Sequence, residues 1–167
     1  MKEIVKPLMQ WYAKHARTLP WRSDPTPYHV WLSEIMLQQT RVEAVIGYYD
    51  RFLEELPNVQ SLAAVSEERL LKLWEGLGYY NRARNLQKAA VQICEQYQGK
   101  FPESYEEWLA LPGIGAYTAG AVTSIAFGKK EAAVDGNVYR IYTRLYADDT
   151  EISKTAFQRN VRETVKE

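Results

Sequence analysis

The sequence predicts an all-α fold, and three observations support that prediction. Apolar residues recur with the period of a helix along nearly the whole chain. No alternating β-branched stretch competes with this pattern, and the nearest candidate, KKEAAVDG, is too short for a strand. The connections, such as LPWRSDPTP and QGKFPE, are short and contain Pro or Gly, as turns between helices do. With 167 residues the chain is long enough for one hydrophobic core, and we expect eight or nine helices.

The N-terminal third contains three helical segments. An apolar stripe predicts the first helix and comprises Ile4, Leu8, Trp11, Tyr12 and His15. The second segment, HVWLSEIMLQQT (residues 29–40), is mostly apolar until its polar end. Another stripe predicts the third helix and comprises Val42, Val45, Ile46, Tyr49, Phe52, Leu53 and Leu56.

The later helices are predicted mainly by signals at their ends. A serine N-cap and two glycines beyond the last turn predict a helix over residues 66–76. A helical pattern then continues over residues 84–99. Ser104 and Glu107 form a capping box, which starts a helix that ends before Pro112. Three more helices are expected over about residues 116–127, 137–146 and 153–167.

Charge and cysteine content restrict the function classes. Lys plus Arg and Asp plus Glu each number 21, so contacts with a nucleic acid would have to be local. The single cysteine, Cys94, excludes an intrachain disulfide and a cysteine-built metal cluster within this chain, and we expect a buried, inert thiol. The sequence contains neither a signal peptide nor the run of about 20 apolar residues that spans a membrane. We therefore expect a soluble intracellular protein.

Glu34 is the first candidate functional residue because apolar side chains flank it on both sides in the sequence. A carboxylate in such surroundings becomes neutral, forms a pair or takes part in chemistry, since burying an isolated charge is costly. Val30, Glu34 and Gln38 share one helix face, so Glu34 has a polar neighbour one turn further on. The structural alternative is an ion pair with Arg22 or Arg41.

The string WLALPGIGAYTAGAV (residues 108–122) contains the second candidate site. A helix ends at Leu111, a Pro-Gly-Ile-Gly turn follows, and a helix of small residues begins. Gly113 and Gly115 leave backbone amides uncovered, and these amides form an anion site with the positive end of the next helix. The structural alternative is a tight helix connection, but the whole string resembles the phosphate-binding helix-hairpin-helix element of DNA repair glycosylases.

Asp135 is the third candidate and lies in AAVDGNVYRIYTRL, just before a predicted helix. Asp is a favoured N-cap residue, so capping alone would explain its position. Asn137 either orients this carboxylate or is a second cap. Asp135 nevertheless adds a second unusual carboxylate to a chain that already has Glu34.

Five strings together resemble the catalytic domain of the A/G-specific adenine DNA glycosylases: LPWR, SEIMLQQTRV, WEGLGYYNRARNL, LPGIGAYTAGAV and AVDGNV. They occur in order and with compatible spacing through essentially the whole chain. This family removes adenine mispaired with 8-oxoguanine or guanine. The resemblance implies a helix-hairpin-helix DNA glycosylase fold, with a six-helix-barrel-type domain and an incomplete second (cluster) subdomain. It also implies that the partner is double-stranded DNA containing A:8-oxoguanine or A:G mispairs.

The resemblance implies catalytic roles for four residues. After the adenine is flipped out of the duplex, Glu34 protonates its N7 atom and later helps to position water. Asp135 stays ionised and stabilises the cationic sugar, as one of the two carboxyls does in glycoside hydrolysis. Tyr117 replaces the Schiff-base lysine of the bifunctional relatives, so we expect a monofunctional hydrolase; its alternatives are packing at a helix start and contact with Asp135 or the sugar. Asn137 orients Asp135 or water.

The resemblance also implies binding residues, although packing is the structural alternative for each. It assigns the probing of the opened base pair to Leu37, Gln38, Gln39 and Thr40, and stacking beside the orphan base to Tyr79. It assigns the lining of the adenine pocket to Trp21 and Arg22, and phosphate binding to Gly113, Gly115, Ala116 and Thr118. It assigns a monovalent cation, Na⁺ or K⁺, to the backbone carbonyls of Leu109, Leu111 and Ile114.

The resemblance divides the chain into three regions: an N-terminal helix of the cluster subdomain (1–22), a helical domain with the hairpin at 105–127 (23–145), and the start of truncated C-terminal helices (146–167). Full-length relatives continue with four cysteines that hold a [4Fe-4S] cluster and with a domain that recognises 8-oxoguanine. Neither is present, so we expect no cofactor in this chain. Leu8, Trp11 and Tyr12 would then be poorly covered, and we expect weak activity.

Three alternatives remain open. A thymine glycosylase of the same superfamily, acting on T:G mismatches, fits Tyr117 but fits Glu34 less well, because protonation of a purine nitrogen needs an acid there. A non-catalytic DNA-binding module would use the hairpin alone. A helical protein-interaction scaffold would leave Glu34, Asp135 and the hairpin unexplained. We expect a monomer in the cytoplasm, associated with the nucleoid.

Overall fold

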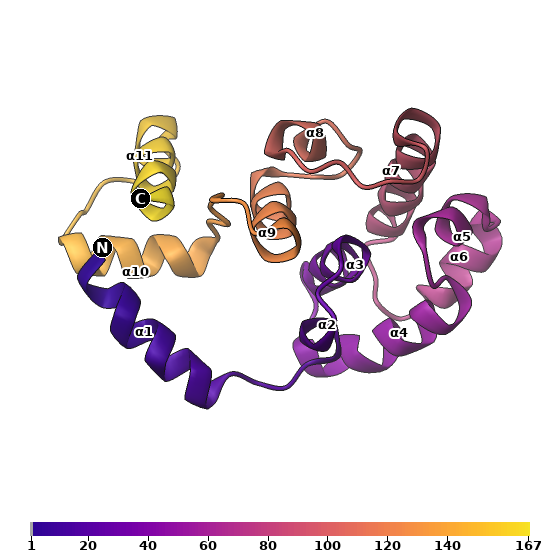
Figure 1. The fold of residues 1–167 in the computed structure, drawn as a ribbon, viewed down its shortest axis with the longest axis horizontal. Coiled ribbons are helices and arrows are strands. Elements are labelled where there is room, and N and C mark those ends of the chain that lie inside the picture. The colour runs from indigo at the N-terminus through magenta and orange to yellow at the C-terminus, as the bar shows by residue number, and fades with distance from the viewer. Residues whose placement is uncertain (1) are drawn as a thin grey trace.

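The computed structural model describes residues 2–167, and every helix or strand it contains in that range is an α-helix, which confirms the predicted all-α class (Figure 1). In chain order the helices are α1 (Lys2–His15), α2 (Pro20–Ser23), α3 (Pro27–Leu37), α4 (Val42–Glu55), α5 (Val59–Ala64), α6 (Glu67–Leu73), α7 (Asn81–Tyr97), α8 (Tyr105–Leu109), α9 (Ala116–Phe127), α10 (Gly136–Tyr146) and α11 (Thr155–Lys166).

The expected number of eight or nine helices is too low for residues 2–167, because two short helices carry too few apolar residues to show a period. α2 has four residues, of which only Trp21 is buried. α5 has six residues and starts with a capping box, in which the Asn58 side chain accepts a hydrogen bond from the Ser61 amide at 2.9 Å. Such a short element is recognised by its cap and not by its periodicity.

α3 is defined by a strong start and by tertiary contacts. Thr26 caps its first turn by accepting from the His29 amide at 3.2 Å, and Pro27 takes the first helical position, where it costs no hydrogen bond. The helix ends at Leu37, so the QQT that follows is a loop and not the last helical turn. All but a few of its residues are buried, which explains the nearly continuous apolar sequence.

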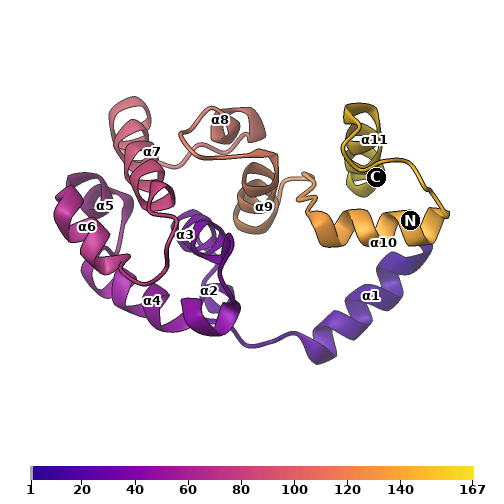
Figure 2. The same ribbon diagram turned by 180° about the vertical axis from the view of Figure 1, so that it is seen from behind.

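The larger lobe consists of α2 to α9 and contains the main hydrophobic core. Trp31, Trp74 and Trp108 are fully buried in it. The rings of Trp31 and Trp108 meet edge to face at a centroid distance of 5.7 Å, and the Trp108 indole donates to the Pro102 carbonyl at 2.7 Å. This core fixes α3 between α4 and α9, as both views show (Figures 1 and 2).

The smaller lobe consists of α10 and α11 around Tyr142, Phe157 and Val161. It is joined to α9 by the connection of residues 128–135, and α1 runs from the part of the chain before α2 towards α10 (Figure 2). Leu8 and Trp11 of α1 are 54% and 56% exposed, as the sequence predicted. Ile141 and Leu145 of α10 are also exposed.

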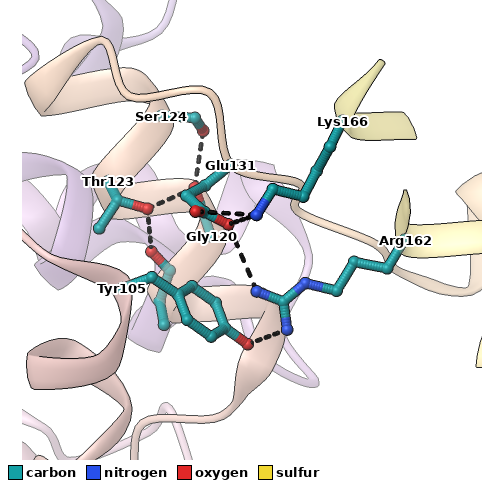
Figure 3. A network of polar contacts seen from close by, with 8 residues as sticks. Tyr105, Gly120, Thr123, Ser124, Glu131, Arg162 and Lys166 are labelled. Atoms are coloured by element: carbon teal, nitrogen blue, oxygen red, sulfur yellow. Dashed lines mark hydrogen bonds and ion pairs between the residues drawn. The ribbon is translucent and has the colours of Figure 1, made fainter. Parts of the chain in front are cut away.

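A polar network ties α11 to the larger lobe (Figure 3). The Arg162 guanidinium lies 3.8 Å from the ring centroid of Tyr105 and also donates to the hydroxyl of that residue. It forms an ion pair with Glu131 at 3.4 Å, and Lys166 pairs with the same carboxylate at 2.9 Å. Because Glu131 lies in the connection that leads to Asp135, the network fixes both the connection and the smaller lobe.

Candidate active site

A cavity of about 640 Å³ lies between α3, α9 and the start of α10. Glu34, Tyr117 and Asp135 all contribute to its lining, although they come from three separate elements. Its size is in the range of pockets that hold small organic ligands. The structure therefore brings together the three side chains whose polar groups the sequence singled out.

Glu34 lies in the third turn of α3, where the main core surrounds the helix. Burial is the largest influence and raises the pKa of the carboxyl. A hydrogen bond from Tyr117 lowers this pKa, the negative charge of Asp135 raises it, and the positive charge of Arg22 lowers it. The net effect is a raised pKa of the Glu34 carboxyl. At a given pH this carboxyl is therefore protonated to a greater extent than that of an exposed glutamate.

The predicted structural alternative for Glu34 was an ion pair. Of the two arginines considered, Arg22 acts on Glu34 only through its charge, and the described residues give Glu34 no ion pair. The Arg22 guanidinium instead donates to the Arg17 carbonyl at 3.1 Å. Arg41 is exposed at the start of α4. Within the described residues the Glu34 carboxyl is therefore free of an ion pair and can interact with a ligand in the cavity.

Asp135 is both the N-cap of α10 and part of the cavity wall. Its Oδ1 accepts from the Val138 amide at 2.9 Å, and its Oδ2 accepts from the Asn137 side chain, also at 2.9 Å. The capping explanation is therefore correct for its backbone position, and it does not compete with a role in the cavity. The two hydrogen bonds hold the carboxylate in one orientation.

Tyr117 lies in the first turn of α9 and is 37% exposed. Burial, the charge of Glu34 and a hydrogen bond to that residue all raise the pKa of its phenol. The phenol therefore keeps its proton and donates a hydrogen bond to Glu34. The sequence left packing, Asp135 or the sugar as its contacts, and this long-range contact with Glu34 was not foreseen.

The other residues that the resemblance assigned to the adenine pocket also line the cavity. Trp21 is buried, with its ring 5.3 Å from that of Tyr49. Leu37 and Gln38 form the wall at the end of α3, and the Gln38 side chain lies 3.5 Å from the Thr118 hydroxyl.

Several cavity residues were missed, namely Tyr12, Arg17, Leu19, Pro25, Ser33, Val42 and Ile125. Val30 also lines the cavity, and the helical spacing in the sequence had placed it on the same helix face as Glu34.

Gln39, a predicted probing residue, and Tyr79, predicted to stack beside the orphan base, lie in two loops. Gln39 is exposed and left-handed, with φ 59°, and Tyr79 is 65% exposed with φ 47°. Neither residue lines the cavity. An exposed aromatic ring in a strained conformation is not explained by packing, because its burial contributes little stability.

The hairpin consists of α8, the turn of residues 110–115 and α9. Gly113 has φ 74°, and a Cβ atom there would lie 2.6 Å from the Cβ of Asn85, so only glycine fits. Gly115 is the N-cap of α9 and provides no side-chain cap. Gly115 and Ala116 are exposed, whereas Thr118 is buried. The first amides of α9 therefore face outwards without a side chain that covers them.

The described residues hold no group of three or more His, Cys, Asp or Glu side chains placed to bind a metal ion. With one cysteine in the chain, a four-cysteine iron–sulfur cluster does not fit. Cys94 is half-buried rather than buried, and burial raises the pKa of its thiol. None of the helices in residues 2–167 is long and apolar enough to cross a membrane.

Comparisons with known proteins agree with this geometry. Residues 32–167 match the family model of the HhH-GPD superfamily base excision DNA repair proteins. The adenine DNA glycosylase of Buchnera aphidicola subsp. Baizongia pistaciae is 45% identical over 141 residues, which cover 84% of this chain and 40% of that protein. The chain therefore spans less than half the length of this relative.

Solved structures share the fold. A thermostable thymine-DNA glycosylase matches with a TM-score of 0.89 and 28% identity, over 99% of this chain and 76% of that one. Endonuclease III, trapped as a covalent intermediate with DNA, matches with a TM-score of 0.81 and 26% identity, over 98% of this chain and 74% of that one. The chain belongs to the HhH-GPD superfamily of base excision DNA repair proteins.

Proposed function

We propose that this chain is the catalytic part of a DNA glycosylase that hydrolyses the N-glycosidic bond of adenine mispaired with 8-oxoguanine or guanine. One observation carries the proposal: Glu34, a half-buried carboxyl with a raised pKa, and Asp135, the carboxylate that caps α10, line one cavity. A carboxyl with a raised pKa beside a second carboxylate is a typical arrangement for a general acid and its anionic partner. The 45% identity to an adenine DNA glycosylase supports adenine as the base.

The chemistry follows from the separate surroundings of the two carboxyls. The flipped adenine enters the cavity, and Glu34 gives a proton to N7, so that the base leaves as a neutral molecule. Asp135 then stabilises the positive charge that develops on the sugar. The Glu34 carboxylate takes a proton from a water molecule, whose oxygen bonds to the sugar carbon that adenine has left, and an abasic site remains. The uncharged phenol of Tyr117 orients Glu34 and forms no Schiff base, so the strand is not cut.

DNA is held in this proposal by local contacts, since the net charge is zero. The hairpin amides around Gly115 and Ala116 bind one backbone phosphate, which requires no basic patch. Gln39 and Tyr79 meet the opened base pair, and Trp21 and Arg22 meet the adenine. The DNA complex of endonuclease III among the structural neighbours supports DNA as the partner.

A monovalent cation at the hairpin is also part of the proposal. Hard cations bind oxygen ligands, and the residues concerned would supply the backbone carbonyls of Leu109, Leu111 and Ile114. The Leu111 carbonyl already accepts from the Ile114 amide at 3.2 Å, which tightens this turn. We further propose a monomer that acts on the DNA of the nucleoid, in the cytoplasm.

A second candidate is a thymine glycosylase that acts on T:G mismatches. The structural match to a thermostable thymine-DNA glycosylase, with its TM-score of 0.89, favours it. The higher sequence identity to adenine DNA glycosylases and the raised pKa of the Glu34 carboxyl favour adenine. Leaving thymine departs as an anion stabilised on oxygen, whereas adenine departs most readily after protonation of a ring nitrogen.

A single-turnover assay with excess protein tests the proposal. Duplexes carry either one adenine opposite 8-oxoguanine or one thymine opposite guanine, and Glu34→Gln is measured in parallel. Alkali-dependent strand cleavage on the first duplex, by the wild type alone, supports a monofunctional adenine glycosylase. Cleavage on the second duplex supports the thymine alternative. No cleavage on either duplex contradicts a catalytic role for this chain.

A further inference from the structure

Arg82 lies in the first turn of α7 and connects to the end of α3. Its Nη1 donates to the carbonyls of Ile35 at 2.8 Å and Met36 at 3.0 Å, and also to the Gln38 carbonyl. The last carbonyls of a helix have no partner within the helix, and a positive charge at this end is favourable. Arg82 therefore caps the C-terminal end of α3, the helix that carries Glu34.

The other amino group of Arg82 reaches a second loop. Its Nη2 donates to the carbonyls of Leu77 at 3.0 Å and Gly78 at 3.2 Å, and to the Thr40 hydroxyl at 3.3 Å. One planar guanidinium thus bonds to the loop after α3 (residues 37–40) and to the loop before α7 (residues 77–80). A lysine could not reproduce this fork, because its ammonium is a single point with three donors.

The contacts of Arg82 fall where both loops are strained. Gln39 and Tyr79 are left-handed without being glycine, with φ 59° and 47°. The guanidinium bonds to the carbonyl directly before each of them, that of Gln38 and that of Gly78. Strained residues persist where the surrounding structure determines them strongly. Arg82 supplies this constraint to both loops at once.

The aromatic surroundings of Arg82 reinforce the connection. The guanidinium carbon lies 5.7 Å from the ring centroid of Tyr79 and 5.4 Å from that of Trp74. Trp74 is fully buried, so one contact anchors the guanidinium to the core. Tyr79 is the exposed ring at the tip of the second loop, so its position depends on Arg82.

We infer that Arg82 is a positioning residue that holds the loops of residues 37–40 and 77–80 as one rigid unit, so that both enter the duplex together when the base is extruded. The inference rests on the proposed function for its DNA step, but the rigid unit is a property of the protein alone. Arg82 also fixes the Gln38 backbone, and Gln38 forms part of the cavity wall. Disturbance of this residue would therefore reach the adenine pocket.

The test compares Arg82→Lys with the control Arg84→Lys. Both variants keep the positive charge, and Arg84 lies on the same helix but pairs only with Glu67 and Asn81, away from the two loops. Circular dichroism and thermal unfolding establish that each variant folds. Amide hydrogen exchange is then followed in peptides covering residues 36–41 and 76–80. Faster exchange in both segments of Arg82→Lys alone is the expected result; unchanged exchange, or a change in one segment only, overturns the inference.

A fluorescence experiment tests the step on DNA. The duplex carries 2-aminopurine opposite 8-oxoguanine, because this base becomes brighter when it leaves the stack. Arg82→Lys should bind within about threefold of the wild type, since its charge is kept. Its fluorescence rise should fall by about tenfold, because a small displacement of positioning groups can cost a factor of that size or more.

The two readouts separate the inference from the proposed function. A normal fluorescence rise for Arg82→Lys overturns the DNA step of the inference. A wild-type protein that neither excises adenine nor brightens 2-aminopurine overturns the proposed function. In that case hydrogen exchange still decides whether Arg82 holds the two loops together.

Discussion

The phenol of Tyr117 donates a hydrogen bond to the carboxyl of Glu34, which joins the first turn of α9 to the third turn of α3. The two elements have opposite effects on the acid. The buried surroundings of α3 raise the pKa of Glu34, and the hydrogen bond from the hairpin side lowers it. The protonation of this carboxyl is therefore set jointly by the core and by the hairpin.

Tyr117→Phe should move the alkaline limb of the pH–rate profile to higher pH. The variant removes the hydrogen bond that favours the carboxylate, so the pKa of Glu34 rises further. A general acid works only while protonated, so activity persists to higher pH. Single-turnover rates across the pH range measure this, with Tyr97→Phe as control, because Tyr97 lies at the end of α7 and does not line the cavity. A limb that stays in place or moves to lower pH would contradict the role of Glu34 as the acid.

Glu34→Gln should abolish most base excision and yet stabilise the fold near neutral pH. Loss of a general acid costs about 10²–10⁴-fold in rate. Because the pKa of Glu34 is raised in the folded state, the free energy of unfolding of the wild type falls as pH rises from the ordinary carboxyl pKa through the folded one. Glu34→Gln has no titrating carboxyl at this position, so its free energy of unfolding does not fall in this way. Urea unfolding at acidic and neutral pH should give a stability gain at neutral pH only; an equal effect at both would count against a raised pKa.

Asp135→Asn and Asp135→Ala should separate the cap from the charge. Asn caps helices about as well as Asp, so the first variant should change the free energy of unfolding little, while the second should cost about 1 kcal/mol. Both remove the carboxylate and should lose excision. Thermal unfolding and single-turnover rates measure the two effects. If Asp135→Asn keeps full activity, the residue is a cap and nothing more.

Local patterns singled out Glu34 and Asp135 as candidates, and the family resemblance supplied their proposed roles. Glu34 is conspicuous because its neighbours in sequence are apolar, and Asp135 because it precedes a helix after an apolar strip. Two explanations of Asp135 competed at that stage, and the structure shows that its backbone amide contacts and its place in the cavity coexist. A carboxylate has two oxygens, so the side chain of Asp135 can cap α10 and also face the cavity.

The contacts between distant segments could not be predicted in the same way. Tyr117 meets Glu34 across more than eighty residues of sequence, and Arg82 meets Ile35 across more than forty. No period or cap in the sequence encodes such a pair, because its geometry depends on how whole helices pack. Arg82 also looks ordinary in a helical string with several arginines, so its half-buried position between two loops appears only in the structure.

Gly120→Ala should destabilise the protein and displace the segment before Asp135. A Cβ atom at Gly120 would lie 2.2 Å from the Ala132 carbonyl oxygen, which is backbone and cannot rotate away. Overpacking of this kind costs about 1–3 kcal/mol. Gly47→Ala is the control, because its Cβ would meet only Arg51 at 3.9 Å within α4 and should be neutral or stabilising. Equal stability of the two variants in urea unfolding would mean that α9 and this segment are not in fixed contact.

Arg162→Gln should loosen the smaller lobe and reduce excision without touching the cavity (Figure 3). The variant loses the cation over the Tyr105 ring and the ion pair with Glu131, whose carboxylate is mostly buried. Hydrogen bonds to charged groups contribute about 1.5–3 kcal/mol, and partial exposure of Arg162 places the expected loss near the lower end. Because α11 packs on α10, and Asp135 caps α10, faster hydrogen exchange in α11 should accompany a lower rate. Arg159→Gln on the same helix is the control, since its charge makes no ion pair within residues 2–167. A slower rate with unchanged exchange in α11 would place the effect of Arg162 elsewhere than in this lobe.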